Sequence, residues 1–288
     1  MIDVASGVTA GAVERIESAD GTTLALHRWE AREPRAVIFY IHGIQSHAGW
    51  LFETGPALSA RGVTVYALDR RGSGRSGGPR GDVPSLAVLL EDYMKAGEIV
   101  GSRHSGLPIT ALGQSLGGSI LAGLVVSGFR ADALLFCAPA LGQVRTRKSA
   151  EERAALLERR SSVALRRVAL EDSDYTVLIP YLEFIVHDQL MLRNVTERAQ
   201  AAFYGLELLY EREEASWPAV PIALARPRRD PIIALEVAEA FLKSKAEDRL
   251  MVAEFPVTEH YLEFSRARHA YWSWVAALAT TTGWSDLS

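Results

Sequence analysis

The sequence has one cysteine in 288 residues, and its apolar runs are short. A lone cysteine cannot form an internal disulfide, so nothing implies an oxidising compartment. Cys137 lies in the stretch "ALLFCAP", where we expect a small buried core residue rather than a reactive thiol. The apolar stretch near Leu121–Phe129 is interrupted by glycine and serine and is too short to span a bilayer. We therefore expect no integral membrane segment.

A secretory signal and an excess of positive charge are also missing. The N-terminal "MIDVASGVTAGAVERIES" has no basic segment followed by an apolar one, so we expect a soluble, cytoplasmic protein. The formal net charge is −4, which gives no reason to expect a nucleic-acid partner. Arginines cluster over Arg153–Arg167, but carboxylates are interspersed there, as is typical of a solvated helix face. The sequence does not determine the oligomeric state.

Short apolar runs alternate along the chain with helical patterns, which predicts an α/β protein with a mostly parallel sheet covered by helices. A chain of 288 residues is long enough to bury a sizeable core. The expected strands are Thr23–Trp29, Arg35–Ile41, Val63–Leu68, Pro108–Leu112, Ala133–Cys137, Pro221–Ala225 and Leu250–Phe255. The expected helices are Trp50–Ala60, Pro84–Ser102, Leu116–Ser127, Pro231–Ser244 and Tyr261–Ala279.

The alternation stops between about Leu141 and Ser216, where no convincing strand is visible. The stretches "SAEERAALLERR", "YLEFIVHDQLML" and "TERAQAAFYGLELLYER" are helical in pattern. We therefore predict a core domain made of residues 1–140 and 217–288, with a helical cap inserted at residues 141–216. The loops that follow parallel strands open at one edge of a sheet, which favours a lid over the site there. The alternative is that the insertion packs as another layer of helices.

One short motif, "GQSLGG", carries the chemistry. It fits G-x-S-x-G with Ser115 at its centre, a strand before it and a helix of small residues after it, which indicates a nucleophile elbow. The sharp turn strains the central residue and exposes its side chain. Gly113 and Gly117 must lack bulk because strand and helix approach closely. The helix N-terminus also favours developing negative charge. The alternative is a glycine-rich turn with an incidental serine.

An oxyanion hole needs two N–H groups, one from the residue after the nucleophile and one from a loop after an earlier strand. We assign the first to Leu116 and the second to Ile44, in "FYIHGIQSHAGW". His42 is interpreted as a residue that shapes this loop rather than as a base. His47 either lines the substrate pocket or is exposed, and Gln114, beside the serine, is assigned to substrate binding.

A nucleophilic serine needs a general base and an acid that orients it. In this arrangement the chain order is serine, acid, histidine. Asp230 is the only acid in "RPRRDPII" after one strand, and His260 follows the last strand in "PVTEHYLEF". Glu259 lies beside the wrong strand, and His269 falls inside the last helix. His187, in the insertion, is a candidate for substrate contact.

With these residues assigned, the chain resembles the α/β-hydrolase superfamily, and within it the monoacylglycerol lipase and lysophospholipase-like group, also called the serine aminopeptidase S33 family. The stretches "HGIQSHAGW", "ALDRRGSGRSGGPRG" and "GQSLGG" carry the resemblance, which spans roughly Asp20 to Ala279. The middle stretch follows the pattern D-x-R-G-x-G-x-S-x-G-x-R-G, matched by Asp69, Arg71, Gly72, Gly74, Ser76, Gly78, Arg80 and Gly81. The resemblance implies an eight-stranded sheet, a helical cap after the sixth strand and ester hydrolysis without metal or organic cofactor.

The chain departs from the family pattern in two places. Members usually have a glycine in G-x-x-D before the acid, whereas Arg226-Pro227-Arg228-Arg229 precede Asp230 here. Members also often have a glutamate shortly after the histidine, where this chain has "YLEFSRAR". The first departure concerns the geometry of the acid loop, and the second concerns the substrate end. The arginines either meet an anionic substrate group or are simply solvated.

The predicted reaction is acyl transfer to Ser115 from a small acyl ester, similar to a monoacylglycerol or a lysophospholipid. The same site could serve a thioesterase, peptidase, acyltransferase or cyclase, because fold does not select among these reactions. A catalytically silent binding protein is a further alternative. Haloalkane dehalogenase and epoxide hydrolase chemistry is disfavoured, since those enzymes have an aspartate where this chain has the serine.

Overall fold

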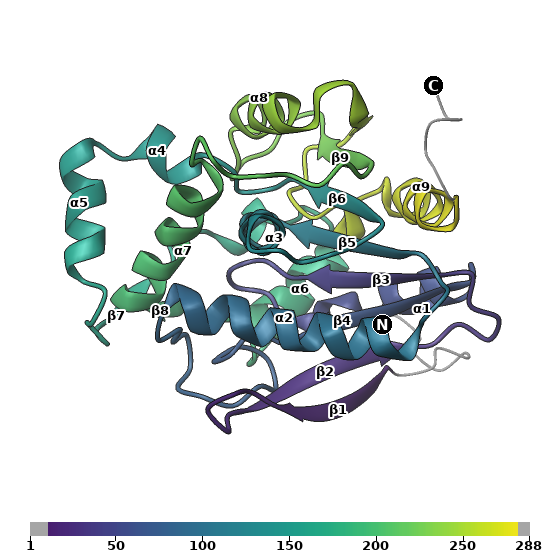
Figure 1. The fold of residues 1–288 in the computed structure, drawn as a ribbon, viewed down its shortest axis with the longest axis horizontal. Helices are drawn as coiled ribbons and strands as arrows, with labels where there is room; N and C mark the ends of the chain where they lie inside the picture. Colours follow the sequence, from purple (N-terminus) through teal and green to yellow (C-terminus); the bar gives the residue numbers. More distant parts are fainter. Residues whose placement is uncertain (1–10, 282–288) are drawn as a thin grey trace.

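Eight strands form one twisted sheet in the order β1-β2-β4-β3-β5-β6-β9-β10 (Figure 1). The structure is a computed structural model and describes residues 11–281. The strands are β1 (Ala12–Glu17), β2 (Thr23–Trp29), β3 (Ala36–Ile41), β4 (Val63–Leu68), β5 (Ile109–Gln114), β6 (Ala133–Cys137), β9 (Ile222–Pro227) and β10 (Leu250–Phe255). β1, β2 and β4 pair antiparallel, and the pairs from β4 through to β10 are parallel. The predicted α/β class and mostly parallel sheet are confirmed.

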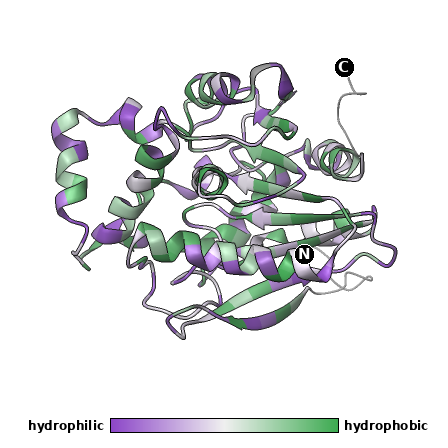
Figure 2. Cartoon of the chain, in the orientation of Figure 1, coloured by the Kyte–Doolittle hydropathy of each residue, from purple (hydrophilic) through white to green (hydrophobic). Residues whose placement is uncertain are grey.

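The central strands are apolar because helices cover them on both faces. Every residue of β3, β4 and β6 is buried. One face packs against α2 (Leu86–Arg103), α3 (Leu116–Val126), α7 (Glu197–Tyr210) and α8 (Leu235–Ala246), and the other packs against α1 (Thr54–Ser59) and α9 (Arg268–Thr280). Hydrophobic residues run along these central strands in Figure 2. The parallel strands end toward the left of Figure 1, where β5 turns into α3.

The seven predicted strands are present, and the eighth, β1, was not predicted. Its sequence "AVERIE" lies at the sheet edge, and of its side chains only Ile16 is buried. Two predicted helices are interrupted. Trp50–Ala60 corresponds to the short helix Ala48–Leu51 followed by α1, and Tyr261–Ala279 corresponds to Leu262–Phe264 followed by α9.

The segment between β6 and β9 contains four helices, α4 (Gln143–Arg147), α5 (Ala150–Glu158), α6 (Ile179–His187) and α7. It also contains two short strands, β7 (Leu165–Arg167) and β8 (Asn194–Thr196), which pair antiparallel. The prediction of no strand here was wrong, because three-residue strands are too short to show alternation and β7 is wholly exposed.

The helices of this insertion have different environments. Phe203 and Leu206 of α7 are buried in the same core as α3, so this helix is a packed layer on the sheet domain. α5 has no buried residue and lies at the left edge of Figure 1. The packed-layer alternative therefore describes α7 well, and a lid function for the insertion stays a prediction.

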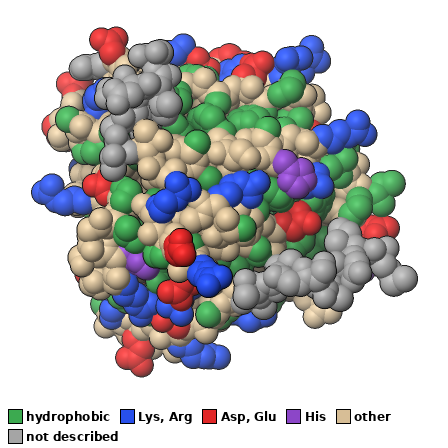
Figure 3. Space-filling view, turned by 90° about the vertical axis from the view of Figure 1, so that its right-hand side faces the viewer, with side chains coloured by type: hydrophobic (Ala, Val, Ile, Leu, Met, Phe, Trp, Pro, Cys, Tyr) green, Lys and Arg blue, Asp and Glu red, His purple; other side chains and the backbone are tan. Residues whose placement is uncertain are grey.

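The face at the opposite side from these helices is shown in Figure 3, where basic and acidic side chains are interspersed. None of the helices in residues 11–281 combines the length and the apolar character needed to cross a bilayer. Residues 1–10 and 282–288 of the predicted core domain lie outside the described residues.

Candidate active site

Ser115 joins the end of β5 to the start of α3 with a backbone conformation that few non-glycine residues adopt. Its φ is 54° and its ψ is −122°. Three hydrogen bonds hold this turn: the Ser115 N–H donates to the Cys137 carbonyl at 3.0 Å, and the Ser115 carbonyl accepts from Gly118 and Ala140, each at 2.9 Å. The strained residue is therefore fixed from β6 and from its own helix.

The glycines on either side of the serine are required by close packing. A Cβ at Gly117 would overlap the carbonyl oxygen of Ile41 in β3. A Cβ at Gly113 would lie 2.5 Å from the Gly117 carbonyl oxygen. The helix therefore starts in direct contact with the strands, as the G-x-S-x-G pattern predicts.

Asp230 and His260 come from the loops after β9 and β10 and are hydrogen-bonded. His260 Nδ1 lies 2.7 Å from Asp230 Oδ2, and both side chains have no exposed surface. The second oxygen of Asp230 accepts from the backbone N–H groups of Ile232 and Ile233 at 2.7 and 2.8 Å. The carboxylate is thus held in place by its own loop, and its free oxygen orients the imidazole.

Gln114 connects the elbow to this pair. Its side chain is fully buried, with Nε2 3.4 Å from His260 Nε2 and with Oε1 lacking a hydrogen-bond partner. The adjacent Ser115 is 6% exposed, and within residues 11–281 its hydroxyl makes no hydrogen bond. The described contact of His260 Nε2 is therefore with Gln114, and its pairing with Ser115 stays a prediction, since a serine-to-base hydrogen bond often tightens only in the substrate complex.

The loop after β3 runs beside the serine. A Cβ on Gly43 would lie 3.3 Å from Ser115 Cβ. Within the described chain, the N–H groups of Ile44 and Leu116 donate to no other group. Leu116 is the first residue of α3, where an N–H has no partner inside the helix. The two N–H groups assigned to the oxyanion are therefore unoccupied donors near the serine.

His42 lies under this loop, is buried, and is tied into it by both ring nitrogens. Nδ1 lies 2.9 Å from the Gly43 carbonyl oxygen, and Nε2 accepts from the Arg70 N–H at 3.0 Å. Burial, and then the nearby charge of Arg70, lower the pKa of His42 to about 3. An imidazole that is neutral at neutral pH and held by these contacts fits the prediction of a loop-shaping residue.

The two histidines predicted to contact substrate have different surroundings. His47 is buried, and its Nε2 lies 3.0 Å from Asp188 Oδ2. His187 is exposed at the end of α6, with Nδ1 2.8 Å from the carbonyl oxygen of Glu183 in the same helix. The substrate-binding roles of His47, His187 and Gln114 stay predictions.

The loop before Asp230 has no glycine, yet the carboxylate reaches His260. The Arg228 N–H donates to the carbonyls of Phe255 and Val257, which fixes the loop against the end of β10. The Arg226 side chain pairs with Glu239 and Glu254, each at 2.8 Å, and Arg228 pairs with Glu254 at 3.3 Å. These two arginines are therefore engaged by carboxylates of the protein itself.

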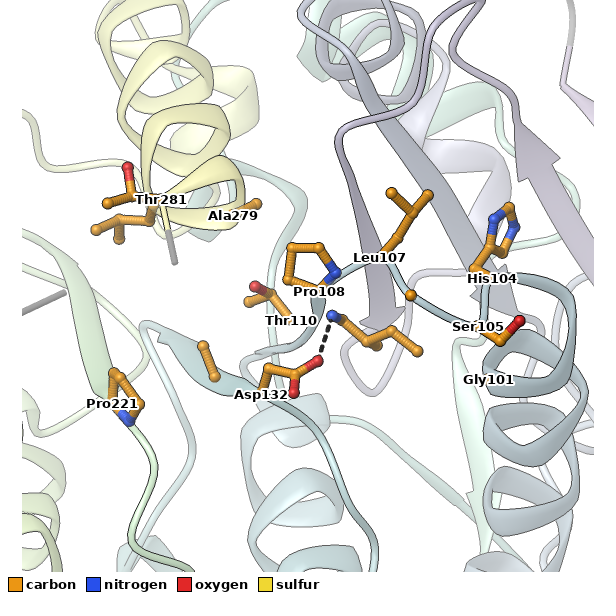
Figure 4. Close-up of a pocket in the computed structure, with 14 residues that line it drawn as sticks. Gly101, His104, Ser105, Leu107, Pro108, Thr110, Asp132, Pro221, Ala279 and Thr281 are labelled. Atoms are coloured by element: carbon orange, nitrogen blue, oxygen red, sulfur yellow. Dashed lines mark hydrogen bonds between the residues drawn. The ribbon is translucent and has the colours of Figure 1, made fainter. Parts of the chain in front are cut away.

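A cavity of about 590 Å³ lies at the other end of the sheet (Figure 4). It surrounds the first residues of β5 and β6, about 20 Å of extended strand away from Ser115. Its Asp132 accepts from the Ile109 N–H, and its His104 is hydrogen-bonded to Tyr66. Its ionisable side chains are already paired, so we do not assign it a role in the reaction.

Asp69, the first residue of the long glycine-rich motif, supports the loop that follows β3. Its carboxylate accepts from the backbone N–H groups of Ala48 and Arg75, each at 2.7 Å, and lies 2.9 Å from His27 Nε2. A Cβ at Gly74 would overlap this carboxylate. The motif thus supports the loop after β3, a role that the pattern alone does not reveal.

The sequence is similar to those of known monoacylglycerol lipases over part of its length. Over 89 residues, 31% of this chain, the sequence is 40% identical to a monoacylglycerol lipase of Mycolicibacterium smegmatis, and the match spans 32% of that relative. Over 104 residues, 36% of this chain, it is 34% identical to human monoglyceride lipase and spans 34% of it. The chain thus aligns with about a third of the length of these curated relatives.

The fold extends over nearly the whole chain. A soluble variant of monoglyceride lipase from Saccharomyces cerevisiae superposes with a TM-score of 0.81 at 15% identity, covering 94% of this chain and 95% of that one. The sequence matches the serine aminopeptidase S33 family over residues 32–265. This chain is therefore a member of the serine aminopeptidase S33 family, with an α/β-hydrolase fold.

Proposed function

We propose that the protein is a serine hydrolase that cleaves small carboxylic esters, with Ser115 as nucleophile, His260 as general base and Asp230 as the orienting acid. One observation carries the proposal: a buried carboxylate–imidazole pair, 2.7 Å apart, lies beside a strained serine elbow. The N–H groups of Ile44 and Leu116 are the proposed oxyanion donors.

The hydrogen bond to Asp230 defines the chemistry of the imidazole. With the Nδ1 proton donated to the carboxylate, Nε2 of His260 is the acceptor for the serine proton. Ser115 then attacks the ester carbonyl, and its oxyanion is stabilised by the two N–H groups. The tetrahedral intermediate collapses as His260 gives the proton to the leaving alcohol, which breaks the ester bond and leaves the acyl group on Ser115. Water, deprotonated by His260, then attacks this acyl group, and the carboxylic acid leaves as Ser115 regains its proton.

Asp230 has to be ionised for this role. Burial alone would raise the pKa of its carboxyl. The charge and hydrogen bond of His260, together with the N–H groups of Ile233 and Ile232, outweigh burial and hold the pKa below its ordinary value. The carboxylate therefore stays negative at neutral pH and stabilises the imidazolium that forms during the reaction.

The proposed substrate is an acyl ester of the monoacylglycerol or lysophospholipid kind. The relatives named above are lipases of monoacylglycerol, and the partly buried apolar side chains of Ile44 and Ala140 belong to the segments that hold the serine. We propose that residues 141–216 act as a cap over this site and that residues 1–140 and 217–288 form the core domain. The proposed location is cytoplasmic.

The test is a Ser115→Ala variant assayed with p-nitrophenyl acyl esters and labelled with a fluorophosphonate. We expect hydrolysis to fall by roughly 10⁴-fold or more and labelling to disappear. The matched control is Ser102→Ala, a serine at the end of α2 whose hydroxyl bonds its own helix. The control should react and label normally. Labelling of Ser115→Ala would contradict the proposal.

A substrate panel separates the remaining reaction classes. Monoacylglycerol, a thioester and a peptide are compared at equal concentration, with and without an alcohol acceptor. Free acid from the glycerol ester supports the proposed function, whereas preference for the thioester or formation of a new ester would replace it with thioesterase or acyltransferase activity. A wild-type protein that takes no label would be a binding protein.

A further inference from the structure

Arg70, which follows β4, is a buried cation with unusual partners. Its side chain is 1% exposed, and within residues 11–281 it forms no salt bridge. Nη1 donates to the carbonyl oxygen of Gly43 at 3.0 Å, and Nη2 donates to that of Ile44 at 2.7 Å. The guanidinium lies 5.5 Å from the ring centre of Phe203 in α7.

Burying a charge without a salt bridge is unfavourable, and the charge of Asp69 offsets only part of the effect of burial on Arg70. A neutral amide could donate to the same backbone carbonyls with a smaller desolvation cost. Burial accordingly lowers the pKa of Arg70, but a guanidinium remains charged at any pH at which the protein is folded. The neighbouring Arg71 shows the ordinary solution, since it pairs with Asp92 at 2.9 Å and with Asp20 at 2.6 Å. The partners of Arg70 therefore need a separate explanation.

The peptide between Gly43 and Ile44 explains why Arg70 bonds to backbone carbonyls. In a trans peptide the carbonyl and the N–H point in opposite directions, and the described chain contains no cis peptide. Arg70 holds the Gly43 carbonyl, and the same oxygen lies 2.9 Å from His42 Nδ1. Two donors on one side of this peptide fix the direction of the Ile44 N–H on the other side, next to Ser115.

His42 completes the arrangement. Its Nε2 accepts from the Arg70 N–H, so the ring proton is on Nδ1 and is donated to the Gly43 carbonyl. Backbone and side chain of Arg70 are thus both tied to the loop. A positive charge on a carbonyl oxygen also polarises the peptide and strengthens its N–H as a donor.

We propose that Arg70 is a positioning residue for the oxyanion hole, which aims and polarises the Ile44 N–H through the Gly43 carbonyl. This rests on the proposed function, because it assumes that Ile44 stabilises the oxyanion formed by Ser115. The motif position occupied by Arg70 is one that the family pattern leaves unspecified, so the sequence alone gives no signal for it.

The experiment compares Arg70→Met, Arg70→Lys and Arg71→Met with the wild-type protein. Each preparation is titrated to completion with a fluorophosphonate, so that kcat refers to folded, reactive protein. The Ki of an alkyl trifluoromethyl ketone, which forms a tetrahedral adduct with a serine, is measured in parallel. Arg71→Met is the control, because it removes a buried guanidinium that touches neither the Gly43 nor the Ile44 carbonyl. If this variant does not fold, Arg71→Lys is used in its place.

We expect Arg70→Met to lower kcat per titrated site by about 10–100-fold, with KM within about threefold, because the lost interaction acts on the transition state. The ketone Ki should rise by the same factor. Arg70→Lys, which keeps the charge, should lie in between, and the Arg71 variant should keep its kcat per site and its Ki.

Two results would overturn the inference. The first is an Arg70→Met protein with wild-type kcat per titrated site, and a loss confined to the labelled fraction or the melting temperature would then make the role of Arg70 structural. The second is a wild-type protein without ester hydrolysis or labelling, which would remove the proposed function as well and is thereby distinguished from the first.

Discussion

The imidazole of His47, in the loop after β3, is hydrogen-bonded to Asp188, which directly follows α6 in the insertion, at 3.0 Å. The same carboxylate oxygen accepts from Trp50 Nε1 at 2.7 Å. Both contacts are largely buried. The loop that contains Ile44 and the end of α6 in the insertion are therefore joined by one carboxylate.

Replacing Asp188 should weaken this junction. Asp188→Ala leaves two buried N–H donors without an acceptor, so we expect the free energy of unfolding to fall by about 2–4 kcal/mol. Chemical denaturation measures this, and limited proteolysis should show faster cleavage within residues 141–216. The control is Glu30→Ala, which breaks an exposed pair with Arg28 and should change stability by less than about 0.5 kcal/mol. Equal stability of the two variants would contradict the prediction.

Two glycine-to-alanine substitutions should act in opposite directions. Gly117→Ala forces a methyl group into the Ile41 carbonyl, so we expect a loss of more than about 3 kcal/mol or no folded protein. Gly101→Ala lies in α2, where the nearest atom would be 4.0 Å away, and should stabilise the protein by about 0.5–1 kcal/mol. Thermal denaturation compares them. A stable Gly117→Ala protein would be incompatible with the observed packing of α3.

The free energy of unfolding should depend on pH through His42. Its pKa is about 3 in the folded state and about 6.5 when unfolded, so the unfolded chain binds more protons between these values. The stabilising contribution is complete above pH 6.5 and is lost as the pH falls toward 3, with a slope of up to about 1.4 kcal/mol per pH unit. In His42→Gln this slope should decrease by up to about 1.4 kcal/mol per pH unit, which corresponds to the loss of one titrating proton. Urea denaturation from pH 7 to pH 4 measures it, and an unchanged slope would refute the assignment to His42.

Asp230→Asn should separate catalysis from folding. The Asn Oδ1 still accepts from Ile232 and Ile233, so the loop should hold and the melting temperature should change by only a few degrees. The neutral amide no longer stabilises the imidazolium or the productive tautomer, so kcat should fall about 10⁴-fold. Ester hydrolysis at saturating substrate measures this. Asp132→Asn, at the far end of the sheet, is the matched control. A small effect of Asp230→Asn on kcat would point to a different acid.

The sequence predicts the parallel core well because its strands are apolar on both faces and are separated by helices with glycine at their ends. It does not predict β1, whose side chains are mostly exposed at an edge, or β7 and β8, which are too short to show a period. Loop position alone brings Ser115, Asp230 and His260 to the same edge of the sheet. The roles of these three residues remain proposals for experiment.

Contacts between segments far apart in the chain cannot be predicted from the sequence pattern. Arg70 bonds to residues 26 and 27 positions earlier, and His47 bonds to a carboxylate 141 positions later. Neither pair is marked by spacing or by a local motif, because both depend on how loops fold over the finished sheet. The Gln114 side chain is a similar case, since its burial against His260 follows only from the packing of β5 beside the last loop.

Cys137 ends β6, is fully enclosed, and offers its carbonyl to the backbone of the serine elbow. As the chain has a single thiol, a thiol-reactive dye can react only when the sheet beside the elbow opens. The rate at which Cys137 reacts with the dye in the native protein therefore reports how often the sheet opens there. A cysteine introduced on the surface would react faster than the enclosed Cys137. A spectroscopic label could therefore be attached selectively to the insertion.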